Sequence, residues 1–320
     1  MKQEYSDWKL LPFVTIKSEM IKTIEQFDSA MKNGETGVAV AGKNELVFHK
    51  GDVAIAGTCF DIDGTDFALS LLKRFAGQKV STGYISAGST DYETVGQKLV
   101  SFSAGVSSEK IKSVKMKSED FKKIQATAGE LFESPVMIKC SPNCSIERIE
   151  FFVEKMMEEQ PLDVVIVDGF EYIKELAVID EDDAENYHVY LEEVMESFSE
   201  LANKNNIAVI LITEASSEWT GERPGLKCFR KKMAIPNMAD MVLLLYNDKV
   251  SYRLIKNDEE EAGENCENSD DEKWVAQRSS EGQWDSAVED ASLFIAKNKR
   301  GGLGVIPIKR NNVTGEYIFQ

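Results

Sequence analysis

The sequence predicts an α/β fold, in which a mostly parallel, twisted β-sheet carries helices on both faces and ends in an antiparallel C-terminal hairpin. First, short apolar runs alternate with helical periods from residue 51 onward, an order typical of parallel sheets. Second, some runs, such as LDVVIV at 162–167, are apolar almost throughout, as in strands covered on both sides. Third, residues 295–319 read as a strand, a glycine-containing turn and a returning strand.

The first half of the domain contains three expected strands and three expected helices. The strands are apolar runs at 53–57, 80–86 and 136–139. The helices have apolar residues at helical spacing and lie at 65–76, 92–102 and 119–133. We expect Ser118 to cap the last of these, with Glu119 and Asp120 at its positive end.

The second half continues the alternation and then changes to strands alone. A helix is expected at 146–159, a buried strand at 162–167 and a helix across 187–201. Two more buried strands follow at 207–213 and 241–246. The chain closes with strands at 293–297, 305–309 and 316–319, the last two forming the hairpin.

We place the core domain at 51–320. One segment precedes this domain, and an acidic insertion lies within it. Residues 1–50 form an N-terminal segment, with an amphipathic stretch at 16–31 that predicts a helix packed on the domain or on a neighbouring subunit. Residues 257–290 hold thirteen acidic residues against Lys273 and Arg278, a net charge of −11. We expect this acidic insertion to be disordered, because it is too polar to bury a core.

The composition excludes several classes of protein. The N-terminal residues lack the apolar core of a secretory signal, and no run approaches the ~20 apolar residues of a membrane span. The five cysteines are scattered and odd in number, which indicates cytoplasmic thiols rather than a disulfide framework. The net charge of −18 argues against general nucleic-acid binding, although a locally basic surface remains compatible with it.

The stretch FDIDGTDFALSLL at 60–72 follows a strand and leads into a helix, the arrangement of a phosphate-binding loop. Its loop has one glycine, no lysine, and aspartates at Asp61, Asp63 and Asp66. A carboxylate about 4 Å from a phosphate oxygen is repelled by about 1 kcal/mol in water and by several in a partly buried site. We expect no neighbouring cation to compensate, so that phosphate binds weakly or not at all.

Other candidate residues lie at strand ends and in one basic loop. Asp168 ends the buried run VVIVD, where P-loop ATPases hold Mg²⁺; the alternative is an aspartate that only ends the strand. Glu214 ends a later strand, and Lys297, Lys299 and Arg300 are expected to protrude from another. The loop at 223–232 is either a solvated loop or an anion-binding surface, and its cations are Arg223, Lys227, Arg230, Lys231 and Lys232.

Taken in order, these segments resemble the C-terminal motor domain of DnaB-type replicative helicases, a RecA-like P-loop fold. The resemblance rests on GDVAIAGTCFDIDGTDFAL for the phosphate loop, VVIVDGFEYI for the Walker B strand and LANKNNIAVILIT for the next helix and strand. The segments LVSFSAGVSSEKIKSVKMKSEDF, RPGLKCFRKKMAIPNMADMVLLLY and IAKNKRGGLG…GEYIF match the stretch after the second strand, the DNA-facing loop and the arginine-finger strand with its hairpin. The family's separate N-terminal domain has no counterpart in the residues that precede the match.

The resemblance implies ATP and Mg²⁺ as cofactors and assigns roles by position. Thr65 and Asp168 would contact Mg²⁺, and Asp168 and Glu214 occupy catalytic positions. Asp63, Gly64 and Thr65 stand where the family has Gly-Lys-Thr, so the phosphate-binding lysine is replaced by Gly64. The matching position of the family's water-activating glutamate is Gly88, and the arginine-finger position is Lys299. Lys297, Lys299 and Arg300 would contact a neighbour's nucleotide in trans.

Three hypotheses follow. The first is a catalytically impaired paralogue that acts as a partner or scaffold in DNA replication or DNA metabolism. It would bind single-stranded DNA through the 223–232 loop, and form a homo-oligomer or associate with a helicase or replication protein. The second is an active ATP-dependent DNA helicase with a rearranged site, in which a neighbour's cation replaces the missing lysine. The third is a protein-binding module without DNA contact.

Overall fold

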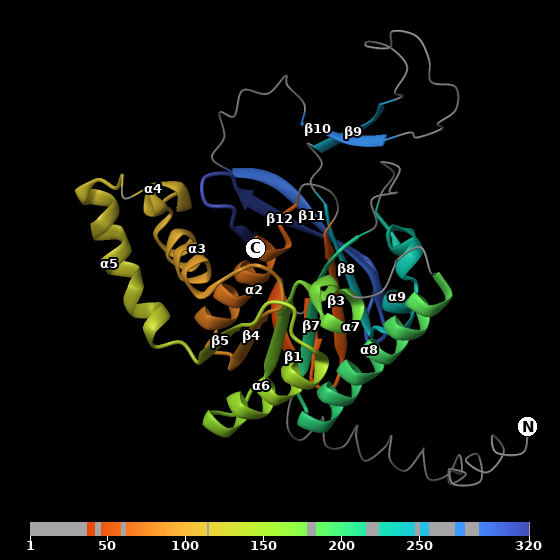
Figure 1. Ribbon diagram of the computed structural model, residues 1–320. Coiled ribbons are helices and arrows are strands. Elements are labelled where there is room, and N and C mark those ends of the chain that lie inside the picture. Colours follow the sequence, from red (N-terminus) through yellow and green to blue (C-terminus); the bar gives the residue numbers. More distant parts are fainter. Residues whose placement is uncertain are drawn as a thin grey trace, which may run out of the picture. The chain divides into compact units, whose positions relative to one another are not determined.

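The computed structural model describes residues 37–41, 46–58, 62–113, 115–177, 184–215, 224–246, 250–255, 273–278 and 288–319 (Figure 1). The chain divides into two units after Gly37, and nearly all described residues belong to the second, residues 38–320. The predicted amphipathic helix at 16–31 lies outside the described residues. Within the described part, no helix is long and apolar enough to span a membrane.

The core of the second unit is a nine-stranded sheet whose strand order is β13-β12-β11-β8-β3-β7-β6-β4-β5. The strands from β8 to β5 run parallel, and β11, β12 and β13 are added antiparallel to β8 and to each other. The predicted fold class is therefore confirmed. The strand bounds are β3 Val53–Thr58, β4 Thr82–Ser86, β5 Val136–Cys140, β6 Val164–Asp168, β7 Ala208–Glu214, β8 Met241–Tyr246, β11 Val288–Asn298, β12 Gly304–Asn311 and β13 Tyr317–Phe319.

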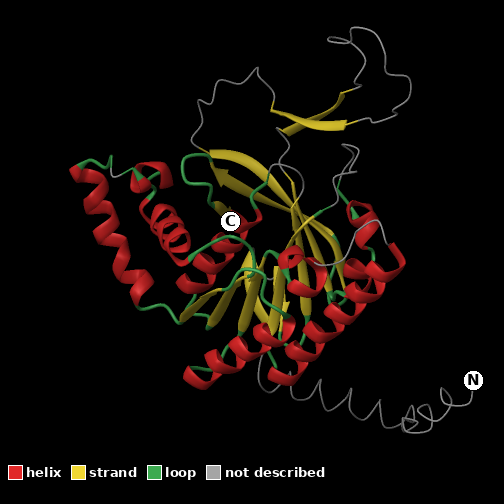
Figure 2. Ribbon diagram, in the orientation of Figure 1, coloured by secondary structure: helices red, strands yellow, loops and turns green. Residues whose placement is uncertain are grey.

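Helices lie on both faces of the sheet (Figure 2). A hydrophobic cluster lies on each of these faces. Alternate residues of each central strand enter different clusters, so that Ile55 faces one and Ala54 and Ala56 face the other. One cluster contains α6 Ile146–Glu159 and α8 Ala184–Asn205; the other contains α2 Gly64–Gly77 and α3 Tyr92–Ala104. The remaining helices are α4 Ser108–Lys112, α5 Ser118–Phe132, η2 Phe170–Tyr172, α7 Lys174–Ala177, η3 Leu226–Lys232 and α9 Ala234–Met238.

Helix α2 ties the parallel half of the sheet to its antiparallel edge. The Phe67 ring packs edge-on against Tyr317 and tilted against Phe319, both with centroids 5.9 Å apart. The Ser70 hydroxyl accepts a 2.9 Å hydrogen bond from the backbone N–H of Tyr317. These contacts hold the first half of α2, the helix that follows the phosphate-loop position, against β13.

The structure adds short elements that the sequence pattern did not predict. Strands β1 Gly37–Ala41 and β2 Leu46–His49 form a separate two-stranded sheet, and Phe48 of β2 packs against Phe75 of α2. Another two-stranded sheet pairs β9 Val250–Ile255 with β10 Lys273–Arg278. Strand β10 and the start of β11 fall inside the segment 257–290 that was expected to be disordered, so parts of it form strands.

The expected cap of α5 is wrong. The helix begins one residue earlier, and its N-cap is Lys117 rather than Ser118. The backbone N–H of Lys117 donates to the Asp120 carboxylate at 3.0 Å. Asp120, which was expected only to favour the positive helix end, therefore satisfies a backbone donor as well.

We expect Phe67→Ala to lower the free energy of unfolding by about 3–5 kcal/mol, because a fully buried ring that joins α2 to β13 is removed. The matched control is Phe132→Ala, whose ring is 87% exposed and whose removal should change stability by less than about 0.5 kcal/mol. Chemical denaturation followed by circular dichroism measures both. Equal effects of the two substitutions would contradict this packing.

Candidate functional site

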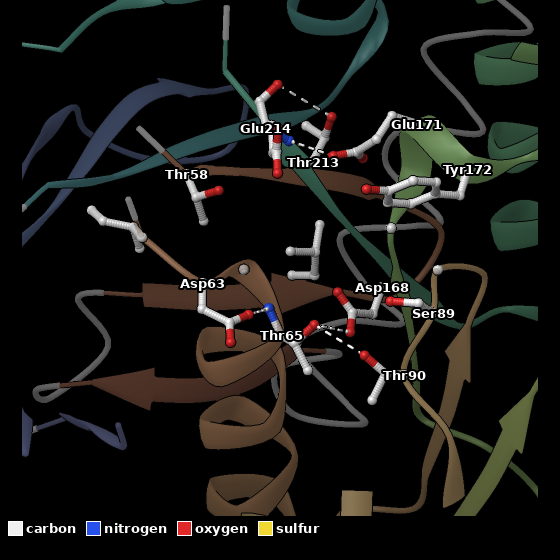
Figure 3. Close-up of a pocket in the computed structure, with 15 residues that line it drawn as sticks. Thr58, Asp63, Thr65, Ser89, Thr90, Asp168, Glu171, Tyr172, Thr213 and Glu214 are labelled. Atoms are coloured by element: carbon white, nitrogen blue, oxygen red, sulfur yellow. Dashed lines mark hydrogen bonds between the residues drawn. The ribbon is translucent and has the colours of Figure 1, made fainter. Parts of the chain in front are cut away.

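A pocket of about 480 Å³ opens at the carboxyl ends of the parallel strands β3, β6 and β7 (Figure 3). Crevices at this edge are where open α/β sheets bind ligands. Carboxylates, hydroxyls and backbone groups dominate its walls, and the described residues that line it include no lysine, arginine or histidine. They are Thr58, Ile62, Asp63, Gly64, Thr65, Gly88, Ser89, Thr90, Asp168, Gly169, Glu171, Tyr172, Ile212, Thr213 and Glu214.

Asp63 caps the helix that would present its N-terminus to a phosphate. It is the N-cap residue of α2, and its Oδ1 accepts a 2.9 Å hydrogen bond from the backbone N–H of Thr65. A helix N-terminus carries unsatisfied N–H groups and a partial positive charge, both of which favour an anion. In this chain the anion is a side chain of the loop itself.

Lys98 of α3 pairs with the two carboxylates, Asp63 and Asp66, at the N-terminal end of α2. Its Nζ lies 3.0 Å from Asp63 Oδ2 and also forms an ion pair with Asp66 Oδ1. The lysine side chain is only 17% exposed. Burial lowers the pKa of Lys98, but the two carboxylates outweigh it and raise the pKa overall. The expectation that no nearby cation compensates the loop aspartates is therefore wrong.

Asp66 is the buried member of this group of three. Burial raises its pKa to about 6, against the opposing effect of Lys98. A Cβ on Gly315, whose φ is +88°, would collide with the Asp66 carboxylate. The turn before β13 therefore closes over Asp66, and the position requires glycine both for its backbone angle and for this close approach.

Asp168 and Thr65, which the family resemblance assigns to Mg²⁺, lie in contact with each other. Asp168 ends β6, and its Oδ2 accepts hydrogen bonds from the Thr65 hydroxyl at 2.8 Å and from the Tyr84 hydroxyl at 2.6 Å. Burial raises the pKa of Asp168, and the two hydroxyl donors oppose that rise. The pKa of Tyr84 is raised as well, first by burial and then by the Asp168 charge.

One acidic and one aromatic residue of η2 form the opposite wall. Glu171 Oε1 accepts a 3.1 Å hydrogen bond from the backbone N–H of Glu214, and burial raises the pKa of Glu171. The side chain of Glu214, predicted as catalytic, is exposed. A Cβ on Gly88 would meet the Tyr172 ring at 3.2 Å. Tyr172 therefore occupies space into which a side chain at position 88 would extend.

Lys299 and Arg300 follow β11 and are exposed, and Lys297 in β11 is partly buried; each of the three cations nevertheless has a partner within the chain. Lys297 Nζ donates to the carbonyl oxygens of Pro236 and Asn237, at 2.8 and 2.7 Å. Lys299 pairs with Asp240 at 2.6 Å, and Arg300 makes two 2.7 Å bonds to Asp52. All four partner residues lie near the amino ends of β3 and β8, at the opposite end of these strands from the pocket. Their proposed contact with a neighbour's nucleotide stays a prediction.

The basic loop is only partly described. Arg223 lies outside the described residues, as do the side chains of Arg230 and Lys231. Lys227 is exposed on η3, and Lys232 at its end is partly buried. Lys232 also lowers the pKa of Glu171 slightly, against the larger effect of burial. The loop's role in binding DNA therefore stays a prediction.

Residues 36–317 match the family model described as the DnaB-like helicase C-terminal domain. The chain belongs to this family. It is 23% identical to the replicative DNA helicase DnaB of Treponema pallidum over 235 residues, which are 72% of this chain and 52% of that protein. With DnaB of Rickettsia felis it shares 22% identity over 316 residues, covering 92% of this chain and 60% of the relative. The chain spans about half the length of the first of these curated relatives.

Solved structures agree with the RecA-like arrangement. One of them, described as an ATPase domain, has a TM-score of 0.72 at 16% identity, and the match covers 97% of this chain and all of that one. A DnaB-like replicative helicase, solved in a study of its interactions with primase, gives the same TM-score over 97% of this chain and 68% of the other. The predicted family resemblance is thereby confirmed at the level of fold.

The described lining of this DnaB-like pocket offers carboxylates and hydroxyls, and no cation, to a nucleoside triphosphate. Asp63 holds the N-terminus of α2 with its own carboxylate, no lysine stands at Gly64, and the described lining residues include no cation. The Thr65 and Asp168 pair remains suited to a hydrated Mg²⁺. Within the described ranges, however, no three His, Cys, Asp or Glu side chains are placed to hold a metal ion directly.

Several residues of this site were missed by sequence reasoning. Lys98 belongs to no motif and lies 35 residues beyond Asp63, so only the fold brings them together. Tyr84 lies in a predicted strand, and Tyr172 follows the Walker B position. Their places in the sequence do not reveal that Tyr84 contacts Asp168 or that Tyr172 packs against Gly88. Glu171 is three residues after Asp168, and its acidity was the one available signal.

The raised pKa of Asp66 predicts a pH dependence of stability. Its pKa moves from 3.8 to about 6 on folding, so between these values the folded chain holds a proton that the unfolded chain has released. This contribution is therefore fully present below about pH 4 and disappears as the pH rises through about 6, at no more than about 1.4 kcal/mol per pH unit. Denaturation of wild type and Asp66→Asn across this range measures the difference.

The expected result is that the unfolding free energy of wild type minus that of Asp66→Asn falls as the pH rises from about 4 to about 6. Asp290→Asn, at an exposed position of β11, is the matched control and should show no such trend of this sign. A difference that rises with pH for Asp66→Asn would contradict the burial of this carboxylate.

Proposed function

We propose that this chain is a catalytically impaired DnaB-type motor domain, which acts as a partner or scaffold in DNA replication or DNA metabolism rather than as a motor. The observation that carries the proposal is the Asp63 carboxylate on the N-terminus of α2, held by Lys98. A phosphate group placed there would have to displace a carboxylate that already satisfies the helix and is already paired.

Charge opposes a triphosphate in this pocket more than shape does. At about 4 Å, a carboxylate and a phosphate oxygen repel by about 1 kcal/mol in water and by more in a partly enclosed pocket. The missing lysine removes the attraction that would offset this repulsion, and loss of a preorganised charge typically lowers catalytic rates by orders of magnitude. The repulsion by Asp63 and the missing lysine at Gly64 both concern the N-terminus of α2.

The replication context comes from relatives. The curated relatives are replicative DNA helicases, and one structural neighbour was described with its primase interactions. We propose that this chain keeps association with a homologous helicase subunit or with another copy of itself, and keeps contact with single-stranded DNA. Intact packing on both faces of the sheet supports this, because the core that would display such surfaces is present.

Titration with a non-hydrolysable ATP analogue and Mg²⁺ tests the proposal. We expect wild type to show no saturable binding up to about millimolar analogue, because Asp63 competes and Gly64 supplies no cation. Asp63→Asn/Gly64→Lys removes the competing charge, keeps a capping side chain, and restores the lysine. It should bind at least about tenfold more tightly than wild type, as measured by calorimetry.

A Cβ at position 64 would lie 3.0 Å from Ile212 Cγ2, so thermal unfolding of the double variant is measured first. Asp63→Asn alone is the control that leaves position 64 untouched, and it should give a smaller gain. Tight analogue binding by wild type, with an affinity that both variants leave unchanged, would contradict the proposal.

A further inference from the structure

A second basic stretch of this acidic chain, besides the 223–232 loop, lies on α4, α5 and the segment between them, and we call it the lysine surface. It contains six lysines and three acidic residues within 109–123, a net charge of +3 in a chain whose total is −18. All six side chains are exposed. They are Lys110, Lys112, Lys115, Lys117, Lys122 and Lys123.

None of these lysines is neutralised within the described part of the chain. Other exposed lysines do have partners there, such as Lys155 with Glu158 and Lys204 with Glu154. The six lysines form no ion pair with any described residue. One of the three acidic residues, Asp120, is engaged by the backbone N–H of Lys117. The positive charge of this surface is therefore available to a partner.

Exposed aromatic rings accompany the charge. Phe121 is 53% exposed and Phe132 is 87% exposed, both on α5. Eleven residues of an α-helix return to within about 20° of the starting direction, so the two rings lie on one face, about 16 Å apart along the axis. The partly buried residues Ile124, Thr127 and Leu131 lie on an adjacent face.

This arrangement is not explained by packing in the core. Helix α5 lies beside α3 and contacts it (Figure 1), yet none of its described side chains is buried. Two exposed phenylalanines on one helix face leave apolar area in water that a partner would cover. Lysines for phosphates and rings for bases are the two components of surfaces that bind single-stranded nucleic acid.

We propose that the lysine surface, together with Phe121 and Phe132, binds single-stranded nucleic acid at a place separate from the 223–232 loop. The lysines neutralise backbone phosphates, and the two rings stack on unpaired bases. An acidic polypeptide would use the same lysines but gives no role to two rings aligned on one face. The proposal does not depend on whether the pocket binds nucleotide.

Fluorescence anisotropy with a labelled oligothymidylate of about 20 nucleotides tests this on the full chain. We expect binding that weakens steeply between about 50 and 200 mM salt. Lys122→Gln/Lys123→Gln should weaken it at least fivefold at the lower salt, and should reduce the slope of log K against log salt by about 0.7 for each phosphate that is no longer neutralised. Lys174→Gln/Lys309→Gln, a matched pair at exposed lysines elsewhere, should change it by less than about twofold.

Phe121→Ala/Phe132→Ala separates stacking from charge. Without the two rings, binding should weaken at least fivefold while the salt slope stays unchanged. A crosslinking experiment on wild type needs no variant: a 5-iodouracil oligonucleotide should crosslink to α5, with Phe121 or Phe132 as the modified residue. Lys227→Gln/Lys232→Gln reports the separate contribution of the basic loop.

Four results would overturn the proposal. The first is no oligonucleotide binding at low salt, and the second is crosslinks that map only outside α4 and α5. The third is an equal weakening by the two lysine pairs, which indicates nonspecific charge. The fourth is binding of labelled polyglutamate in place of the oligonucleotide, which indicates an acidic polypeptide as the partner of this surface.

Discussion

The N-terminus of α2 needs a negative charge, and the source of that charge determines what the pocket can do. In a phosphate-binding loop the ligand supplies it, and a lysine and a chain of backbone N–H groups hold the ligand in place. Here Asp63 supplies it from within the chain, and Lys98 pairs with both Asp63 and the buried Asp66. Because a buried carboxylate without a partner is destabilising, Lys98 stabilises the folded chain by pairing with Asp63 and Asp66.

On the opposite wall of the pocket, the Tyr172 ring lies beside the glycine that stands at the position of the family's glutamate. Tyr172 packs against Gly88, so a side chain at the position that matches the family's glutamate would meet the Tyr172 ring at its Cβ. Gly169, between Asp168 and η2, has a φ of +84° and lies close to the Gly88 backbone. The Thr65–Asp168 contact nevertheless persists. The sheet and its two packed faces thus match the family's fold, while Asp63, Gly64 and Gly88 differ from the residues that the family resemblance leads us to expect at these positions.

The parts of the fold that depend on burial could be predicted from the sequence. Strands such as β6 and β8 are apolar almost throughout, and α6 presents one apolar face, so their bounds follow from periodicity. Short elements such as β1 and β2 carry too few residues for a pattern. The order of motifs identifies Thr65, in the first turn of α2, and Asp168, at the end of β6, as candidate site residues. Lys98 does not, because an ion pair between distant segments leaves no local signal.

The same limit applies to charged residues in general. From the sequence, Lys299 and Arg300 are candidates for contact with a neighbouring subunit, yet in the structure they form ion pairs with Asp240 and Asp52. The lysines of α4 and α5 are equally visible in the sequence, and only their exposure and the absence of ion pairs to described residues distinguish them as a surface. Charge in a sequence identifies candidates, and the fold decides which of them are available to a partner.

Whether the pocket supports nucleotide hydrolysis is the central question, and a turnover assay tests it most directly. Phosphate release by the purified chain is measured with ATP, Mg²⁺ and saturating single-stranded DNA, beside an Asp168→Ala variant. We predict that wild type and variant give the same background rate, because on our proposal Asp63 competes with the triphosphate and Gly64 supplies no cation. DNA-stimulated release by wild type that Asp168→Ala abolishes would contradict this.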